Sequence, residues 1–194
     1  MPPMILASGS GSRRVLLKRL GLPFHCDAPD IDETPRESET PHGLAERLSR
    51  DKARALAQCY PQHLIIGSDQ VAGIDNDLLG KPGSIDAARR QLERFSGRRV
   101  SFWTGVALLD TRRDRCVTHV DLTSVDIRTL SAREIEGYVT KEPAVDSAGG
   151  FYMEKLGTAL FESVETTDPS ALMGLPLIAL CRLLREAGVN PLLD

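Results

Sequence analysis

Residues 4–14 decide the class of fold, and they read Met4-Ile5-Leu6-Ala7-Ser8-Gly9-Ser10-Gly11-Ser12-Arg13-Arg14. The apolar run 4–7 predicts a short buried strand, and residues 8–12 follow it as a tight turn. Apolar residues at positions 15, 16, 17 and 20 then predict a helix over residues 13–20 that ends at Gly21. A strand that leads through a turn into a helix indicates a protein that combines both kinds of element.

Strands and helices are mixed along the rest of the chain. Strands are predicted over residues 24–28, 64–66, 99–109, 117–128 and 158–165, with a hairpin over 71–79 that turns at Asp75-Asn76. Helices are predicted over residues 44–59, over 84–95 with Ser84 as N-cap and Gly97 after the end, and over 131–141 with a capping box of Ser131 and Glu134. A final helix is predicted between Pro176 and Gly188. The acidic, proline-rich residues 29–41 and the glycine-rich residues 148–156 are expected to be loops. The expected class is therefore α/β with a mixed sheet.

Length and charge exclude several classes of function. A chain of 194 residues fits one domain, residues 1–194, or two small lobes that share a core. The formal charge of −3 gives no bulk attraction to nucleic acid or to an anionic membrane, and aromatic residues make up only 5% of the chain. The cysteines form no C-x-x-C pair, and no segment reads as a signal peptide or membrane span. We therefore expect a cytoplasmic protein.

The Gly/Ser turn at residues 8–12 is a candidate anion site. Backbone N–H groups at a helix N-terminus, serine hydroxyls and the guanidinium groups of Arg13 and Arg14 all suit a phosphate. The turn does not match the Walker A loop, because G-x-x-x-x-G-K-[ST] is absent. Read by themselves, the same residues are also typical of a turn and a helix N-cap with two solvated arginines.

Carboxylates and lysines form a second group of candidate site residues. Asp69 follows the apolar strand 64–66, where a metal ligand or a base is often found. Asp30, Asp32 and Glu33 lie in the early loop, and the two aspartates are most simply solvated loop acids. Acids close to a phosphate site would repel the ligand unless a divalent cation such as Mg²⁺ lay between them. Lys52 and Lys81 can contact phosphate as point charges, so the residues indicate chemistry on a phosphate ester or anhydride.

These residues, in this order, resemble the Maf family of nucleoside triphosphate pyrophosphatases. The matching segments are Leu6-Ala7-Ser8-x-Ser10 with Arg13-Arg14, Asp32-Glu33, Lys52-Ala53, Gly67-Ser68-Asp69-Gln70, Gly80-Lys81-Pro82, Ala148-Gly149 and Gly174-Leu175-Pro176-Leu177. The resemblance runs from about residue 5 to the C-terminus. It implies a mixed twisted sheet in a two-lobed Maf/ITPase-like architecture with a central cleft, and it implies a homodimer.

The resemblance also implies the chemistry. Members cleave a nucleoside triphosphate between the α and β phosphates with a divalent metal cation, Mg²⁺ or Mn²⁺. Asp69 falls at the position of the proton acceptor, and Glu33 and Asp69 fall at metal-coordinating positions. The phosphate-contacting positions correspond here to Ser8, Ser10, Arg13, Arg14, Lys52 and Lys81. Gly11 departs from the family pattern, in which proline is usual at this place.

Base specificity in the family depends on positions that match Ser12, Gln70 and Glu154. Gln70 and Glu154 look like the branch that hydrolyses 7-methyl-GTP, whereas that branch usually has tryptophan where Ser12 stands. A carboxylate at Glu154 can accept both donors on the pairing edge of guanine, and N7 methylation strengthens the attraction. An aromatic face could stabilise the cationic base, with Phe151, Tyr152 and Trp103 as candidates.

Three alternatives stay open from the sequence. The same chemistry could act on dTTP, UTP or another modified nucleotide. The protein could instead be a nucleotide-binding regulator of septum formation, which would bind without turnover. Nucleic-acid binding through Arg89-Arg90 and Arg98-Arg99 is disfavoured, because interspersed acids make these pairs typical of solvated helix and turn faces.

Overall fold

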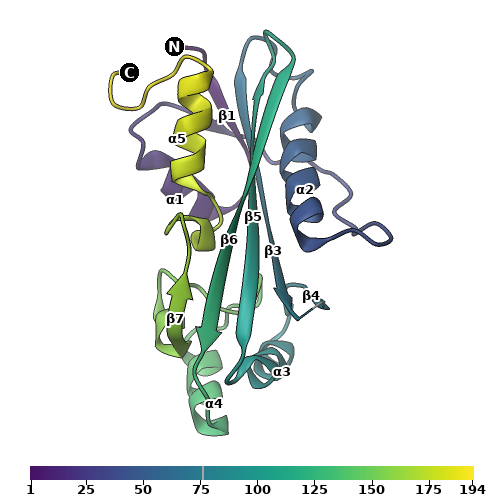
Figure 1. Ribbon diagram of the computed structural model, residues 1–194, viewed down its shortest axis with the longest axis vertical. Helices are drawn as coiled ribbons and strands as arrows, with labels where there is room; N and C mark the ends of the chain where they lie inside the picture. Colours follow the sequence, from purple (N-terminus) through teal and green to yellow (C-terminus); the bar gives the residue numbers. More distant parts are fainter. Residues whose placement is uncertain (76) are drawn as a thin grey trace. The chain divides into compact units, whose positions relative to one another are not determined.

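A computed structural model describes residues 1–75 and 77–194 of the chain (Figure 1). These residues form two compact units. The first unit comprises Met1–Gln70, Trp103–Asp121 and Asp168–Asp194, and the second comprises Val71–Phe102 and Leu122–Thr167. Asn76, in the predicted hairpin turn, lies outside the described residues.

Within residues 1–75 and 77–194 the sheet has seven strands, in the order β2-β1-β3-β5-β6-β7 with β4 paired to β3. Strand β1 pairs in parallel with both β2 and β3, whereas β4 pairs antiparallel with β3 and β7 pairs antiparallel with β6. The strands are β1 (Met4–Ala7), β2 (His25–Cys26), β3 (Leu64–Ile74), β4 (Asp77–Leu79), β5 (Arg99–Asp110), β6 (Arg115–Ile127) and β7 (Phe161–Glu165). The predicted α/β class with a mixed sheet is therefore confirmed.

Helices cover both faces of the sheet in the first unit (Figure 1). Helices α1 (Gly11–Lys18) and α5 (Leu177–Glu186) lie on one face, and α2 (Pro41–Ala55) lies on the other. Successive strand residues point to opposite faces. Accordingly, Met4 and Leu6 of β1 belong to the core under α1 and α5, whereas Ile5 and Ala7 belong to the core under α2.

Two strand glycines let α2 approach the sheet closely. A Cβ atom at Gly67 of β3 would lie 2.0 Å from the carbonyl oxygen of Ser49, and one at Gly105 of β5 would lie 2.3 Å from the carbonyl oxygen of Ala45. Such contacts are far shorter than van der Waals distance, so only glycine fits at either strand position. The close packing fixes where α2 places its polar side chains over β3.

The second unit contains α3 (Ile85–Phe95), α4 (Ala132–Lys141) and the short 3-10 helix η1 (Leu156–Leu160). Ser84 caps α3, and Ser131 and Glu134 form the predicted capping box at the start of α4. Phe151 packs edge-on against Phe102 and Phe161, with ring centroids 5.5 Å and 4.9 Å away. Phe102 and Phe151 of this aromatic cluster are buried.

Several predicted boundaries were wrong, and the helix predicted over residues 44–59 spans Pro41–Ala55 instead. The strand predicted to end at Ile66 continues to Ile74, so Asp69 lies within β3 and not after a strand. The first helix begins at Gly11, because Ser10 serves as its N-cap, and it ends at Lys18. The second strand is only His25–Cys26, and residues 158–160 belong to η1 instead of a strand.

Candidate active site

Lys52 of α2 brings two predicted site residues together. Its Nζ lies 2.6 Å from Oδ1 of Asp69 on β3 and 2.7 Å from Oε1 of Glu33 in the loop before α2. Lys52 and Asp69 are each 8% exposed, while the Glu33 side chain is 54% exposed. Two carboxylates therefore converge on one ammonium group, at a place where one carboxylate is buried and the other faces solvent.

The turn after β1 supplies further polar groups to the first unit. Ser8 Oγ accepts hydrogen bonds from Ser10 N at 3.2 Å and from Arg13 Nη1 at 3.4 Å. Arg13 Nε also donates to the carbonyl oxygen of Gly174 at 2.8 Å. Burial lowers the pKa of Arg13, whereas the negative charges of Asp69 and Glu33 raise it.

Arg13, Asp69 and Glu33 therefore share one electrostatic environment. An arginine is protonated at any physiological pH, so Arg13 adds a second cation to the cluster around Lys52. Arg14 is exposed, and Ser10 uses its hydroxyl as the helix N-cap by accepting from Arg13 N. Ser10 is therefore the N-cap of α1. Its turn can contact an anion as well.

Alternate side chains of β3 face opposite sides of the sheet and make different contacts. Gly67 and Asp69 face α2, whereas Ser68 and Gln70 face the chain segment that precedes α5. Ser68 Oγ is within 2.8 Å of the carbonyl oxygen of Gly105 and 2.9 Å of that of Gly174. Ser68 thus ties β3 to a residue that also accepts a hydrogen bond from Arg13.

Gln70 is committed to similar contacts. Its Nε2 lies within hydrogen-bond distance of Thr104 Oγ1 and of the carbonyl oxygens of Ala171 and Leu172, at 3.0, 3.0 and 3.1 Å. These contacts hold the short 3-10 helix η2 (Ala171–Met173) against the sheet. The amide nitrogen of this predicted specificity residue is therefore engaged by its own chain. Ser12, the second such residue in this unit, is half-buried in the first turn of α1.

Arg47 of α2 holds the loop that carries Glu33. It is 6% exposed, and its Nε and Nη2 donate to the two carboxylate oxygens of Glu39 at 2.7 and 2.9 Å. Nη2 also donates to the carbonyl oxygen of Thr34 at 3.1 Å. We call this arrangement of Arg47, Glu39 and Thr34 the loop clasp.

The loop clasp predicts a pH-dependent stability. The hydrogen bonds from Arg47 lower the pKa of Glu39 from its ordinary value of 4.5 to about 2. A carboxylate with a lowered folded-state pKa stabilises the fold above its unfolded pKa, and this contribution is lost as the pH falls from 4.5 to about 2. We expect Glu39→Gln to lower the melting temperature at pH 6, and the difference from wild type to vanish near pH 2.

Thermal unfolding followed by circular dichroism from pH 2 to pH 7 measures this effect. Glu37→Gln, at an exposed glutamate of the same loop, serves as the control and should follow the wild-type curve throughout. A Glu39→Gln difference that persists unchanged at pH 2 would contradict the assignment to ionised Glu39.

Lys81 and Glu154 belong to the second unit, and both are exposed. Glu154 lies close enough to Tyr152 for its charge to help raise the pKa of that phenol, which burial chiefly raises to about 12. Lys155 Nζ lies 4.3 Å from the centroid of the half-buried Tyr152 ring. Of the candidate aromatic faces, Phe151 is only 3% exposed and belongs to the core.

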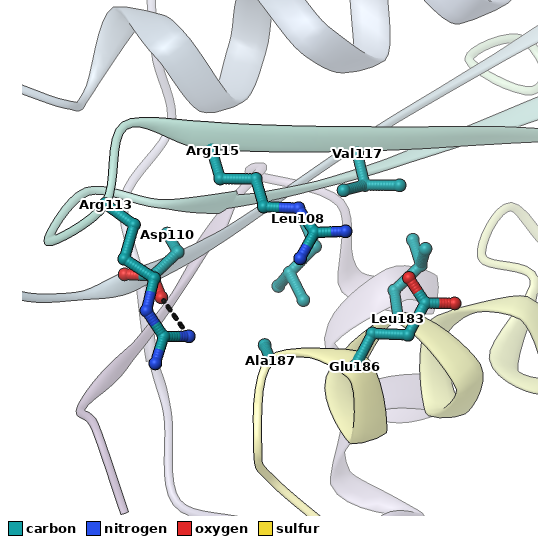
Figure 2. A pocket seen from close by; sticks show the side chains of 8 residues that line it. All are labelled: Leu108, Asp110, Arg113, Arg115, Val117, Leu183, Glu186 and Ala187. Carbon is teal, nitrogen blue, oxygen red and sulfur yellow. Dashed lines mark ion pairs between the residues drawn. The ribbon is translucent and has the colours of Figure 1, made fainter.

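Figure 2 shows a pocket in the first unit between α5 and strands β5 and β6. Leu183 and Glu186 of α5 face Leu108 and Val117, and Arg113 forms an ion pair with Asp110 at 3.5 Å. Arg115 and Ala187 complete the lining. None of the predicted site residues lines this pocket, so it is separate from the Lys52 cluster.

The donor set at the Lys52 cluster suits a hard cation shared with a ligand. Among residues 1–75 and 77–194, no group of three or more His, Cys, Asp or Glu side chains is arranged to hold a metal ion. Magnesium, however, commonly uses only one or two carboxylates, together with substrate phosphates and water. Glu33 and Asp69, which already meet at one cation, are carboxylates of that kind.

The sequence did not reveal the residues that support this cluster. Arg47 bonds to Glu39 and Thr104 bonds to the carbonyl oxygen of Ala171, and these partners lie 8 and 67 positions away along the chain. One signal was present, because an isolated glycine in a strand pattern often marks a close backbone approach. Gly105, within the predicted strand 99–109, is of this type.

The fold and the cluster define an α/β protein in which cations and carboxylates meet beside a helix N-terminus. Residues 3–187 match the family model described as Maf-like protein. The chain belongs to the Maf family. No helix within the described part of the chain has the length and apolar character needed to cross a membrane.

Relatives agree with this placement. A protein of Chromohalobacter salexigens named 7-methyl-GTP pyrophosphatase is 54% identical over 192 residues, which cover 99% of this chain and 100% of that protein. The structure of a HAM1 protein from Coxiella burnetii is similar with a TM-score of 0.56 and 20% identity, covering 96% of this chain and 100% of that chain. The second likeness concerns the fold alone.

Proposed function

We propose that this protein is a nucleoside triphosphate pyrophosphatase that hydrolyses 7-methyl-GTP to 7-methyl-GMP and pyrophosphate. The observation that carries the chemistry is the meeting of Asp69 and Glu33 at the Lys52 ammonium group. The proposed substrate follows from the Chromohalobacter salexigens protein named 7-methyl-GTP pyrophosphatase, which is 54% identical to this chain over its full length. Family membership supports the same reaction.

The triphosphate needs donors and cations, and the chain provides both. Ser8, Arg13 and the N-terminal end of α1 form one set in the first unit. Lys52 adds a buried ammonium group, and Lys81 is an exposed lysine that we assign to the same phosphate chain. Arg14 lies on the exposed side of α1 and is assigned a supporting, long-range role.

Asp69 is assigned the role of the base that orients and deprotonates the attacking water. Lys52 engages Oδ1, and no hydrogen bond reaches Oδ2 from any residue that the structure describes. A carboxylate with one oxygen fixed by a cation can present the other to water in a defined direction. Lys52 and Arg13 then stabilise the negative charge that develops on the phosphates.

Glu33 and Asp69 are the residues that would hold a divalent cation. When bound there, Mg²⁺ or Mn²⁺ would supply Lewis-acid stabilisation of the phosphate oxygens. Glu33 is suited to this role because more than half of its side chain faces solvent, where a ligand can reach it.

Glu154 is assigned to the base of the nucleotide. A guanine edge offers it two donors, and a charged hydrogen bond contributes about 1.5–3 kcal/mol. Glu154→Ala should therefore lower kcat/KM for 7-methyl-GTP about 10–100-fold and leave kcat/KM for UTP nearly unchanged. The exposed Glu162 of β7 provides the control, Glu162→Ala. Equal losses on both nucleotides would contradict this role.

A panel of triphosphates with pyrophosphate detection, with and without Mg²⁺, tests the proposed function. We expect 7-methyl-GTP to be the best substrate and EDTA to abolish turnover. A tenfold preference for dTTP would overturn the proposed substrate, and full activity in EDTA would remove the metal. Binding without turnover of any triphosphate would favour a regulator over an enzyme. The homodimer and the cytoplasmic location stay predictions.

A further inference from the structure

We propose that Arg47 is a positioning residue that fixes the Glu33 carboxylate, and thereby the affinity for the divalent cation. The inference rests on the proposed function, since it assigns a role to Glu33 in that site. It adds that the loop clasp determines the position of Glu33, a proposed metal ligand that is exposed. Arg47 itself pairs with Glu39, Asp51 and the Thr34 carbonyl, and within the described residues it forms no hydrogen bond or ion pair with Lys52 or Asp69.

The position of the Glu33 side chain must be fixed by hydrogen bonds to its loop, because burial does not fix it. Its side chain is 54% exposed, and residues 27–40 contain neither helix nor strand. A solvent-exposed glutamate on an unsupported loop would sample many positions and would lose conformational entropy on binding a cation. In the structure its Oε1 nevertheless lies 2.7 Å from Lys52 Nζ.

Hydrogen bonds on both sides of Glu33 explain this placement. Thr34 N donates to Asp32 Oδ1 at 2.9 Å, and this bond spans Glu33. The carbonyl oxygen of Thr34 accepts from Arg47 Nη2 at 3.1 Å. The peptide between Thr34 and Pro35, one residue beyond Glu33, is thus held to α2, the same helix that carries Lys52.

The chemistry of the clasp requires arginine. The guanidinium group reaches both oxygens of Glu39 and the Thr34 carbonyl at once, and it is 6% exposed. Arg36 N also donates to Glu39 Oε2 at 3.0 Å, so Glu39 closes the far end of the loop. A lysine could keep the charge but could not form this fork. The clasp therefore depends on planar geometry as well as on charge.

Two variants loosen the clasp without changing a proposed metal ligand. Arg47→Lys keeps the charge and removes the fork, and Glu39→Gln keeps an acceptor and removes the charge. The matched control is Arg54→Lys, because Arg54 lies on the same helix and pairs with Asp114 at an exposed site, 3.5 Å away. Unfolding curves at pH 7 identify any variant that does not fold, and the other variant then carries the test.

Binding of Mn²⁺ is measured by electron paramagnetic resonance in the presence of a nonhydrolysable triphosphate analogue. Loss of a residue that orients a metal ligand commonly weakens affinity about 10–100-fold, and we expect a loss of that size for Arg47→Lys and Glu39→Gln. Arg54→Lys should bind Mn²⁺ within about twofold of wild type. Unchanged Mn²⁺ affinity in a folded clasp variant would overturn the proposal.

A double-mutant cycle with Glu33→Ala shows whether Arg47 acts through Glu33. In the Glu33→Ala background, Arg47→Lys should cause no further loss of Mn²⁺ affinity. Equal losses in both backgrounds would overturn the positioning role. If Glu33→Ala itself binds Mn²⁺ as wild type does, the role of Glu33 fails and the inference fails with it. Failure of the proposed function is distinct, because wild type would then release no pyrophosphate from any triphosphate.

Discussion

The Asp69→Asn variant is expected to hydrolyse 7-methyl-GTP about 10²–10⁴-fold more slowly than wild type, the range for loss of a positioned general base. The amide has nearly the shape of the carboxylate, but it cannot accept a proton from water. The substitution also removes the negative charge that pairs with the Lys52 ammonium group, whose Nζ lies 2.6 Å from Asp69 Oδ1. Steady-state kinetics with pyrophosphate detection measures the effect, which should fall mainly on kcat.

The control for this prediction is Asp27→Asn in the same unit. Asp27 accepts a hydrogen bond from the Tyr60 hydroxyl at 2.9 Å, and an asparagine oxygen can accept the same bond. Asp27→Asn should therefore keep near wild-type rates. An Asp69→Asn variant that folds and retains its rate within about twofold would exclude Asp69 as the base.

Gly67→Ala is expected to destabilise the fold by about 3 kcal/mol, the upper part of the usual range for overpacking. The added Cβ would lie 2.0 Å from the carbonyl oxygen of Ser49 and 2.8 Å from the amide nitrogen of Ala53. Both are backbone atoms of α2, so relief requires the helix to move away from β3. Since α2 carries Lys52, activity should fall together with stability. Urea unfolding monitored by circular dichroism gives the change in the free energy of unfolding.

The same substitution should have the opposite sign at Gly137 in α4. A Cβ there meets nothing within 4 Å, and alanine is favoured over glycine inside a helix by about 0.5–1 kcal/mol. Gly137→Ala should therefore be neutral or stabilising. If Gly67→Ala unfolds at the same urea concentration as wild type, α2 does not pack on β3 as closely as described.

Local patterns in the sequence were sufficient for most elements. The buried strand Met4–Ala7 was predicted because four apolar residues precede a Gly/Ser turn, and the capping box of Ser131 and Glu134 marked the start of α4. Ser84 and Gly97 likewise bounded α3. These signals depend on bonds within a few residues of one another, so a single sequence contains them.

Strand β3 shows why other features could not be predicted. Gly67, Ser68 and Asp69 have low strand propensity, so the sequence favoured an end at Ile66. Tertiary contacts override that preference: Ser68 bonds to Gly174, 106 positions away, and Asp69 bonds to Lys52, 17 positions away. The strand propensities of these three residues carry no information about contacts with such distant positions.

The candidate site divides in the same way. The motif residues Ser8, Arg13, Lys52 and Asp69 were predicted from residue patterns and from a resemblance that spans the chain, and all lie in the first unit. Arg47 and Glu39 were missed, because an arginine and a glutamate eight positions apart across a helix start have no distinguishing pattern. Only the folded loop shows that they meet.

Product analysis of 7-methyl-GTP incubated with the protein and Mg²⁺ tests the central claim most directly. Anion-exchange chromatography with wild type and Asp69→Asn in parallel identifies which anhydride bond is broken. The account predicts 7-methyl-GMP and pyrophosphate in equal amounts from wild type, with almost none from the variant. Release of 7-methyl-GDP and phosphate, or equal yields from both proteins, would contradict it.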